Sequence, residues 1–182
     1  MKILALSGSL RAASNNTMLL RAVARLAPED ISVELFHELG NLPLFNPDIE
    51  ESDPPAVARF RAQLLAADAV LIASPEYAHG VTGAMKNALD WMVGCEAFVN
   101  KPVALLNASP RAIHAQASLK ETVSMMSALI VEEASITVPI LGSNLDEKGI
   151  ISHTGISRAL REMLLALQRH ARQTYDNPLQ SA

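Results

Sequence analysis

The sequence contains a single cysteine, Cys95, among its 182 residues. An intrachain disulfide is therefore impossible, and a zinc site built from several thiolates is excluded. The five histidines form no i, i+4 pair and stand beside no carboxylate at the spacing of metal ligands, so we predict no metal site. Such sparse use of cysteine is typical of a reducing compartment, and we expect a cytoplasmic protein.

Long uncharged apolar runs are also missing. None reaches the ~18 residues of a membrane span, and the N-terminus has too few apolar residues before Gly8 and Arg11 for a signal peptide. The 15 basic and 19 acidic residues give a net charge of -4, which provides no broad basic surface for nucleic acid or an anionic membrane. Any anion site must therefore be local. We expect one folded domain over residues 1–182, with a frayed tail after about residue 175.

Patterns typical of buried strands alternate with helical patterns along the chain. Strands are predicted at residues 3–6, 31–35, 69–73, 103–106 and 136–138. Helices are predicted at residues 16–26, 56–67, 83–93, 115–128 and 156–172. Four prolines between Asn41 and Pro55 predict a long loop without helix or central strand. This alternation predicts an α/β fold, a flavodoxin-like three-layer sandwich whose five-stranded parallel sheet has the order 2-1-3-4-5 with helices on both faces.

The loop after the first predicted strand is rich in groups that bind anions. Residues 8–16 read G-S-L-R-A-A-S-N-N and lead into a helix, where open α/β sheets bind ligands. A phosphate there would receive backbone N–H groups and the hydroxyls of Ser9 and Ser14. The Asn16 amide and the charged Arg11 side chain add further donors. The spacing differs from that of triphosphate and dinucleotide loops, which favours a monophosphate. The alternative is that Ser14 or Asn15 only caps the helix and that Arg11 is a solvated side chain.

A second informative stretch, residues 74–91, follows the third predicted strand. It reads S-P-E-Y-A-H-G-V-T-G-A-M-K-N-A-L-D-W. In the predicted strand order the first and third strands are neighbours at the point where the sheet reverses direction, so both loops can contact one ligand. Asn87 and Trp91 lie one helical turn apart on one face, which we interpret as anchoring of this helix and as contacts between subunits.

The two loops together resemble the NADPH-dependent FMN reductase family of flavodoxin-like quinone and azo-compound reductases. The first loop matches the family signature G-S-L/I-R-x-x-S-x-N in full. The second matches its S-P-E-Y and G-x-M-K-N-x-x-D-W portions, and Ala78 stands where the family usually has Asn. After the fourth predicted strand the family often shows a glycine-rich run, whereas this chain has N-A-S-P-R-A-I-H at residues 107–114.

This resemblance implies an FMN site built by the two loops. The phosphate would be held by Ser9, Arg11, Ser14 and Asn16, and Asn15 would also belong to the cofactor site. The isoalloxazine ring would be lined by Pro75, Glu76, Tyr77, His79 and Gly80, and the cofactor site would also include Ala78 and Ser109. Arg111 and His114 would either line the substrate pocket or point to solvent.

The activity implied by the resemblance is that of an FMN-dependent NAD(P)H oxidoreductase without a catalytic side chain, because the flavin carries the chemistry. NADPH or NADH would donate hydride, and the small-molecule electron acceptor would be free flavin, a quinone, an azo compound or chromate. The resemblance also implies a homodimer or homotetramer. One alternative is a flavodoxin-type electron carrier with a protein redox partner, although the charge balance fits poorly with the acidic surface of such carriers. A flavin-free interaction protein is the other alternative.

Overall fold

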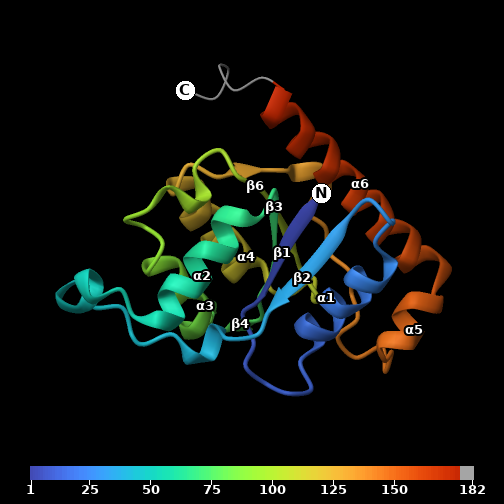
Figure 1. The fold of residues 1–182 in the computed structure, drawn as a ribbon. Coiled ribbons are helices and arrows are strands. Elements are labelled where there is room, and N and C mark those ends of the chain that lie inside the picture. The colour runs from blue at the N-terminus through green and yellow to red at the C-terminus, as the bar shows by residue number, and fades with distance from the viewer. Residues whose placement is uncertain (177–182) are drawn as a thin grey trace.

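The computed structural model describes residues 1–176 and arranges them in three layers, a sheet between two sets of helices (Figure 1). The strands of the sheet are β1 (Lys2–Ser7), β2 (Ser32–Phe36), β3 (Ala69–Ala73), β6 (Pro102–Leu106) and β7 (Leu129–Ile130). All neighbours pair in parallel, in the order β2-β1-β3-β6-β7. The predicted flavodoxin-like fold and its 2-1-3-4-5 strand order are therefore confirmed.

Helices cover both faces of the sheet. They are α1 (Asn15–Leu26), α2 (Pro55–Ala66), α3 (Gly83–Asp90), α4 (Ile113–Met125), α5 (Glu147–Ser152) and α6 (Thr154–Asp176). Ile3 and Ala5 of β1 belong to a hydrophobic cluster that includes side chains of α1, α5 and α6. Leu4 and Leu6 belong to a second cluster that includes side chains of α2, α3 and α4. Because both faces of β1 are buried, its sequence is a continuous apolar run rather than an alternating one.

The sheet edge beside β6 differs from the prediction. The predicted strand at residues 136–138 contributes only an isolated parallel bridge between Asn107 and Thr137. A 3-10 helix at Glu132–Ala134 separates this bridge from the short strand β7. Ser135 Oγ accepts the Leu105 N–H at 3.1 Å, so a side chain replaces a strand partner at the break. The preceding helix ends at Met125 rather than at residue 128, and Ser127 has a left-handed backbone, with a φ of 61°.

Several shorter elements also depart from the predictions. The proline-rich loop contains a 3-10 helix at Pro47–Ser52, so the prediction of no helix there was wrong, and another 3-10 helix at Leu39–Asn41 leads into the loop. Helix α5 was not predicted, and neither was the hairpin of β4 (Glu76–Tyr77) and β5 (Gly80–Val81). Helix α3 ends earlier and α6 extends further than predicted. The predicted frayed tail lies outside the described residues from position 177 onward.

The proline-rich loop is fixed to α3 by the two residues that were predicted to anchor this helix. Asn87 Nδ2 and Trp91 Nε1 donate to the Pro43 carbonyl oxygen at 3.0 and 2.7 Å. The Phe45 N–H donates to Asn87 Oδ1 at 2.7 Å, and its ring packs edge-on against the Trp91 indole. The structural part of that prediction is therefore confirmed. Across residues 1–176, no helix has the combination of length and apolar character that crossing a bilayer requires.

Candidate functional site

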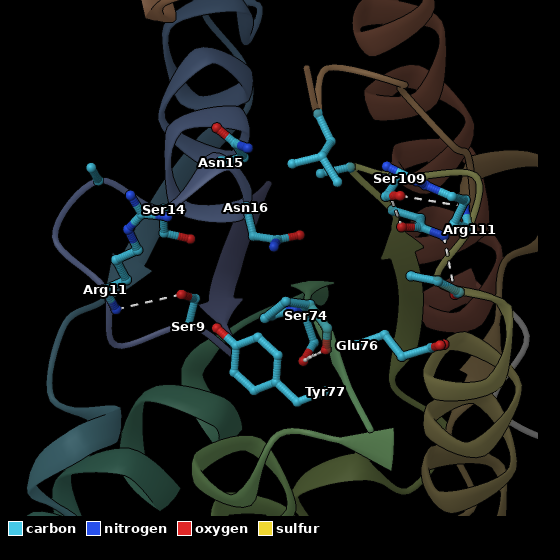
Figure 2. Close-up of a pocket in the computed structure, with 16 residues that line it drawn as sticks. Ser9, Arg11, Ser14, Asn15, Asn16, Ser74, Glu76, Tyr77, Ser109 and Arg111 are labelled. Atoms are coloured by element: carbon cyan, nitrogen blue, oxygen red, sulfur yellow. Dashed lines mark hydrogen bonds between the residues drawn. The ribbon is translucent and has the colours of Figure 1, made fainter. Parts of the chain in front are cut away.

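A cavity of about 340 Å³ opens at the carboxyl edge of the sheet, where the loops after β1, β3 and β6 meet (Figure 2). It is called the first cavity below, and the three loops are called the first, second and third loop. The predicted site residues in its lining are Ser9, Arg11, Ser14, Asn15, Asn16, Pro75, Glu76, Tyr77, Ser109 and Arg111. Segments separated by about a hundred residues in the sequence thus converge on one space, as expected at the switch point of an open parallel sheet.

The remaining predicted residues lie outside this lining. Ala78 and His79 form the two-residue turn between β4 and β5, and both are exposed. Gly80 follows them in β5. The His79 ring stacks on the His114 ring, with centroids 4.3 Å apart and planes 23° from parallel. The structure therefore brings these two histidines together beside the cavity rather than inside it.

Some lining residues were missed by the sequence reasoning. Asn107 is buried at the end of β6 and shapes the third loop: its Oδ1 accepts the Ser109 N–H at 2.9 Å, and its Nδ2 donates to the Ala112 carbonyl at 3.3 Å. A buried Asn directly after an apolar strand is the signal that would have found it. Leu141 reaches the cavity from the segment after the interrupted sheet edge, and no local pattern marks it.

The first loop presents its polar groups toward the cavity at the start of α1. Ser14 caps this helix, with its Oγ accepting the Thr17 N–H at 3.3 Å. The Asn16 side chain points into the space between the first and third loops (Figure 2). Asn16 is 7% exposed, and its Oδ1 has no hydrogen-bond partner among the described residues. A buried polar atom without a partner costs about 1–3 kcal/mol, so this amide is suited to a ligand.

The donor set of the first loop fits a flavin mononucleotide. A ribityl hydroxyl can donate to Asn16 Oδ1, and the same amide, rotated by half a turn, can donate to a phosphate oxygen. Ser9 Oγ, the Arg11 guanidinium and the N–H groups at the start of α1 supply further donors for a phosphate dianion. The described chain therefore contains the groups that this cofactor needs.

The first and second loops are held in direct contact. The Gly8 N–H donates to the Ala73 carbonyl at 2.8 Å, and Thr82 Oγ1 donates to the Gly8 carbonyl at 2.6 Å. A Cβ on Gly8 would lie 2.2 Å from Ser74 Oγ and 3.1 Å from Ser74 Cα. Only glycine permits this approach, so the separation of the two loops depends on Gly8.

Glu76 connects the second loop to the third. Its Oε2 accepts the Ala115 N–H at 2.8 Å, within the first turn of α4. The residue preceding α4, Ala112, offers no side-chain cap, so the Glu76 carboxylate takes this role. Negative charge at a helix N-terminus is favourable. Glu76 thus fixes the position of α4 while it lines the cavity.

The β4–β5 turn carries backbone strain that one substitution should relieve. Ala78 and His79 have φ values of 49° and 61°, as in a type I′ turn, which prefers Asn at its first central position. Ala78→Asn is expected to raise the free energy of unfolding by about 1 kcal/mol, because the left-handed conformation costs alanine more than asparagine. Urea denaturation measures this difference. The control Ala117→Asn, on the exposed side of α4, should instead lower the free energy of unfolding by about 0.5 kcal/mol. Destabilisation by both variants would contradict the assignment of backbone strain to Ala78.

A parallel sheet of this order, with its first and second loops meeting over a cavity beside a helix start, defines a flavodoxin-like nucleotide-binding protein. The family model of the NADPH-dependent FMN reductases matches residues 1–140. A Pseudomonas aeruginosa NAD(P)H-dependent FMN reductase is 34% identical over 173 residues, covering 92% of this chain and 93% of that protein. The chain belongs to the NADPH-dependent FMN reductase family.

Other relatives have related activities in their names. A 2-hydroxy-1,4-benzoquinone reductase from a Burkholderia species is 37% identical over 158 residues, covering 83% of this chain and 85% of that protein. Among solved structures, the flavoenzyme NAD(P)H:(acceptor) oxidoreductase FerB from Paracoccus denitrificans superposes with a TM-score of 0.77 at 25% identity, covering 93% of this chain and 98% of that one. The chain is thus an FMN-dependent NAD(P)H oxidoreductase that acts on a small-molecule acceptor.

Proposed function

We propose that the first cavity is the FMN site and that the enzyme reduces quinones. The phosphate is assigned to Ser9, Arg11, Ser14 and Asn16, with Asn15 beside them, and the ring to Pro75, Glu76 and Tyr77 of the second loop, with Ser109 on the third loop. Ala78, His79 and Gly80, which lie outside the lining, are assigned to the edge of the ring site. The observation that carries this proposal is the convergence of the first and second loops on one cavity that contains the buried, unpartnered oxygen of Asn16. The quinone assignment is supported by the names of several relatives.

When bound, FMN would accept hydride from NAD(P)H and would pass the two electrons on to the acceptor. The side chains of the first loop bind and orient the phosphate, with Arg11 opposing its negative charge. The Thr82–Gly8 and Glu76–Ala115 hydrogen bonds hold the loops around the ring at fixed separation. Tyr77, 60% exposed at the cavity rim, offers an aromatic face for a planar acceptor. Arg111, which lines the cavity just before α4, and His114, which lies in the first turn of α4 outside the lining, are assigned to the acceptor side of the site.

We further propose a cytoplasmic homodimer or homotetramer in which residues 1–182 form a single FMN-binding domain. Support for the subunit contact comes from Leu44 and Val93, which are 83% and 66% exposed on the proline-rich loop and just after α3. Trp91 Nε1 donates to the Pro43 carbonyl, so the segments that carry these two side chains lie next to each other. Neighbouring exposed apolar side chains are typical of surfaces that associate. Sedimentation velocity measures the oligomeric state, and Leu44→Glu is expected to shift it toward monomer.

The function is tested by anaerobic stopped flow on the FMN-saturated protein. Mixing with NADPH or NADH is expected to bleach the visible flavin band, and mixing with benzoquinone should restore it. Because donor and acceptor use the same open cavity, steady-state rates should give parallel double-reciprocal lines. A bound flavin that neither nucleotide bleaches would indicate the electron carrier, and failure to retain FMN would indicate the flavin-free interaction protein.

A further inference from the structure

A second cavity, of about 330 Å³, lies on the other side of the first loop. Its lining includes Ser7 and Phe36, the last residues of β1 and β2, which are neighbouring strands. The cavity therefore lies at the carboxyl edge of the sheet, where open α/β folds bind ligands. Ser9 and Arg11 line both cavities, so the two spaces adjoin across the first loop.

The lining of the second cavity is basic although the chain has a net charge of -4. It includes Arg11, Arg21 from α1 and His37, which directly follows β2. Among the described residues around this cavity, none is Asp or Glu. The neighbouring Glu38 is not part of the lining, and its Oε2 is bound by the Arg59 guanidinium at 2.6 Å. An anion entering the cavity would therefore meet cationic and hydroxyl groups without an opposing carboxylate.

The arginines of this cavity are also without protein partners. Most arginines form an ion pair with a carboxylate or donate to a carbonyl oxygen, namely Arg25, Arg59, Arg61, Arg158, Arg161 and Arg172. Within residues 1–176, the guanidinium groups without such a partner are those of Arg11, Arg21, Arg111 and Arg169. All of these except Arg169 line one of the two cavities. Guanidinium groups left unpaired at a concave surface are well suited to phosphate.

We propose that the second cavity binds a phosphomonoester dianion, and that its source is the 2′-phosphate of NADPH. In Rossmann-type dinucleotide-binding folds, an acidic residue receives the ribose 2′-hydroxyl of NADH, whereas an arginine nearby accommodates the 2′-phosphate of NADPH. The first loop of this chain is assigned to the FMN phosphate, so only that preference of a 2′-phosphate for cations without a carboxylate is carried over. His37, directly after β2, and Arg21 line the second cavity, and its described lining contains no carboxylate. Because the cavities adjoin, one dinucleotide can place its nicotinamide in the first and its 2′-phosphate in the second.

This inference rests on the proposed function, since the first cavity must bind the flavin that NADPH reduces. Arg21 and His37 do not line that first cavity, so they are not needed for the FMN phosphate. Substitution of Arg21 therefore tests the second cavity without changing a residue of the FMN phosphate site. Arg25, one turn further along α1, pairs with Glu147 at 2.7 Å and lines neither cavity, which makes Arg25→Gln a matched control.

The test is isothermal titration calorimetry of the FMN-saturated protein with adenosine 2′,5′-bisphosphate, adenosine 5′-monophosphate and inorganic phosphate. The bisphosphate is expected to bind about tenfold more tightly than the monophosphate, because its 2′-phosphate would gain one or two charge-assisted hydrogen bonds. Arg21→Gln should reduce this ratio to about two, and Arg25→Gln should leave it unchanged. In steady-state assays, Arg21→Gln should raise KM for NADPH about tenfold and leave KM for NADH and the FMN content unchanged.

Equal affinity for the two adenosine nucleotides would overturn the proposal, as would an Arg21→Gln variant that discriminates like the wild type. Inorganic phosphate that binds as tightly as the bisphosphate, and is lost in Arg21→Gln, would make free phosphate the ligand and overturn the assignment to NADPH. Failure of the proposed function has a different signature, because the protein would then retain no FMN or would oxidise neither nucleotide. The calorimetric comparison would still decide whether the second cavity recognises a 2′-phosphate.

Discussion

Replacing Arg11 by glutamine should weaken FMN binding by about 10- to 100-fold, the effect of losing a hydrogen bond between charged groups. Arg11 is the one cationic side chain that the first loop offers to the first cavity, and it has no protein partner among residues 1–176. The affinity is measured by quenching of flavin fluorescence as apoprotein is titrated with FMN. The double variant Ser9→Ala/Arg11→Gln should lose still more, because both side chains are directed to the same phosphate.

Riboflavin provides the control for this prediction, since it has the same ring and ribityl chain without the phosphate. Arg11→Gln should leave riboflavin affinity within about twofold of the wild type. Equal losses for FMN and riboflavin would show that Arg11 supports the loop rather than the phosphate. The calorimetric assay with adenosine 2′,5′-bisphosphate also distinguishes the roles of Arg11 and Arg21. Arg11 lines both cavities, whereas Arg21 lines only the second.

The first loop was predictable because its chemistry is local. A buried strand, a short polar loop and a helix start follow each other without interruption, so the spacing alone places Ser9, Arg11 and Ser14 at a helix N-terminus. The strand order then places the loop after β3 beside it. Sequence periodicity is sufficient for these steps, since strands buried on both faces and amphipathic helices leave clear patterns.

Ser109 and Arg111 on the third side of the cavity were predicted from the family resemblance, and both line it. How this side is held in place was not predictable, because it depends on interactions between distant segments. The hydrogen bond from Ala115 to Glu76 joins residues 39 positions apart, and it gives the start of α4 a cap that its own sequence lacks. The sequence pattern at residues 136–138 predicts a regular edge strand. In the structure, however, the Ser135 side chain accepts the Leu105 N–H, and only an isolated bridge forms at Thr137. Leu141 lines the cavity from the segment that follows this interruption, where its N–H donates to the Ala108 carbonyl of the third loop at 3.3 Å.

Gly8→Ala is the substitution expected to damage both stability and cofactor binding. The added Cβ would lie 2.7 Å from Ser74 Cβ and 3.1 Å from Ser74 Cα, so the backbones of the first and second loops must separate. Overpacking of this kind costs about 1–3 kcal/mol. The same movement would lengthen the Thr82–Gly8 hydrogen bond of 2.6 Å and misplace the phosphate donors relative to the ring loop. We expect a lower urea midpoint together with at least about tenfold weaker FMN binding.

Gly83→Ala is the matched control, because a Cβ at Gly83 meets no atom within 4 Å. Gly83 is the first residue of α3, where alanine is the better helix former, so this variant should be neutral or more stable by up to about 1 kcal/mol. The double variant Gly8→Ala/Ser74→Gly removes the two closest side-chain atoms but leaves the backbone of residue 74 as close as before. It should therefore recover part of the lost stability and part of the FMN affinity. Full stability in Gly8→Ala alone would mean that the loop separation is not set by this glycine, and the origin of the cavity would then have to lie in the hydrogen bond between Glu76 and α4.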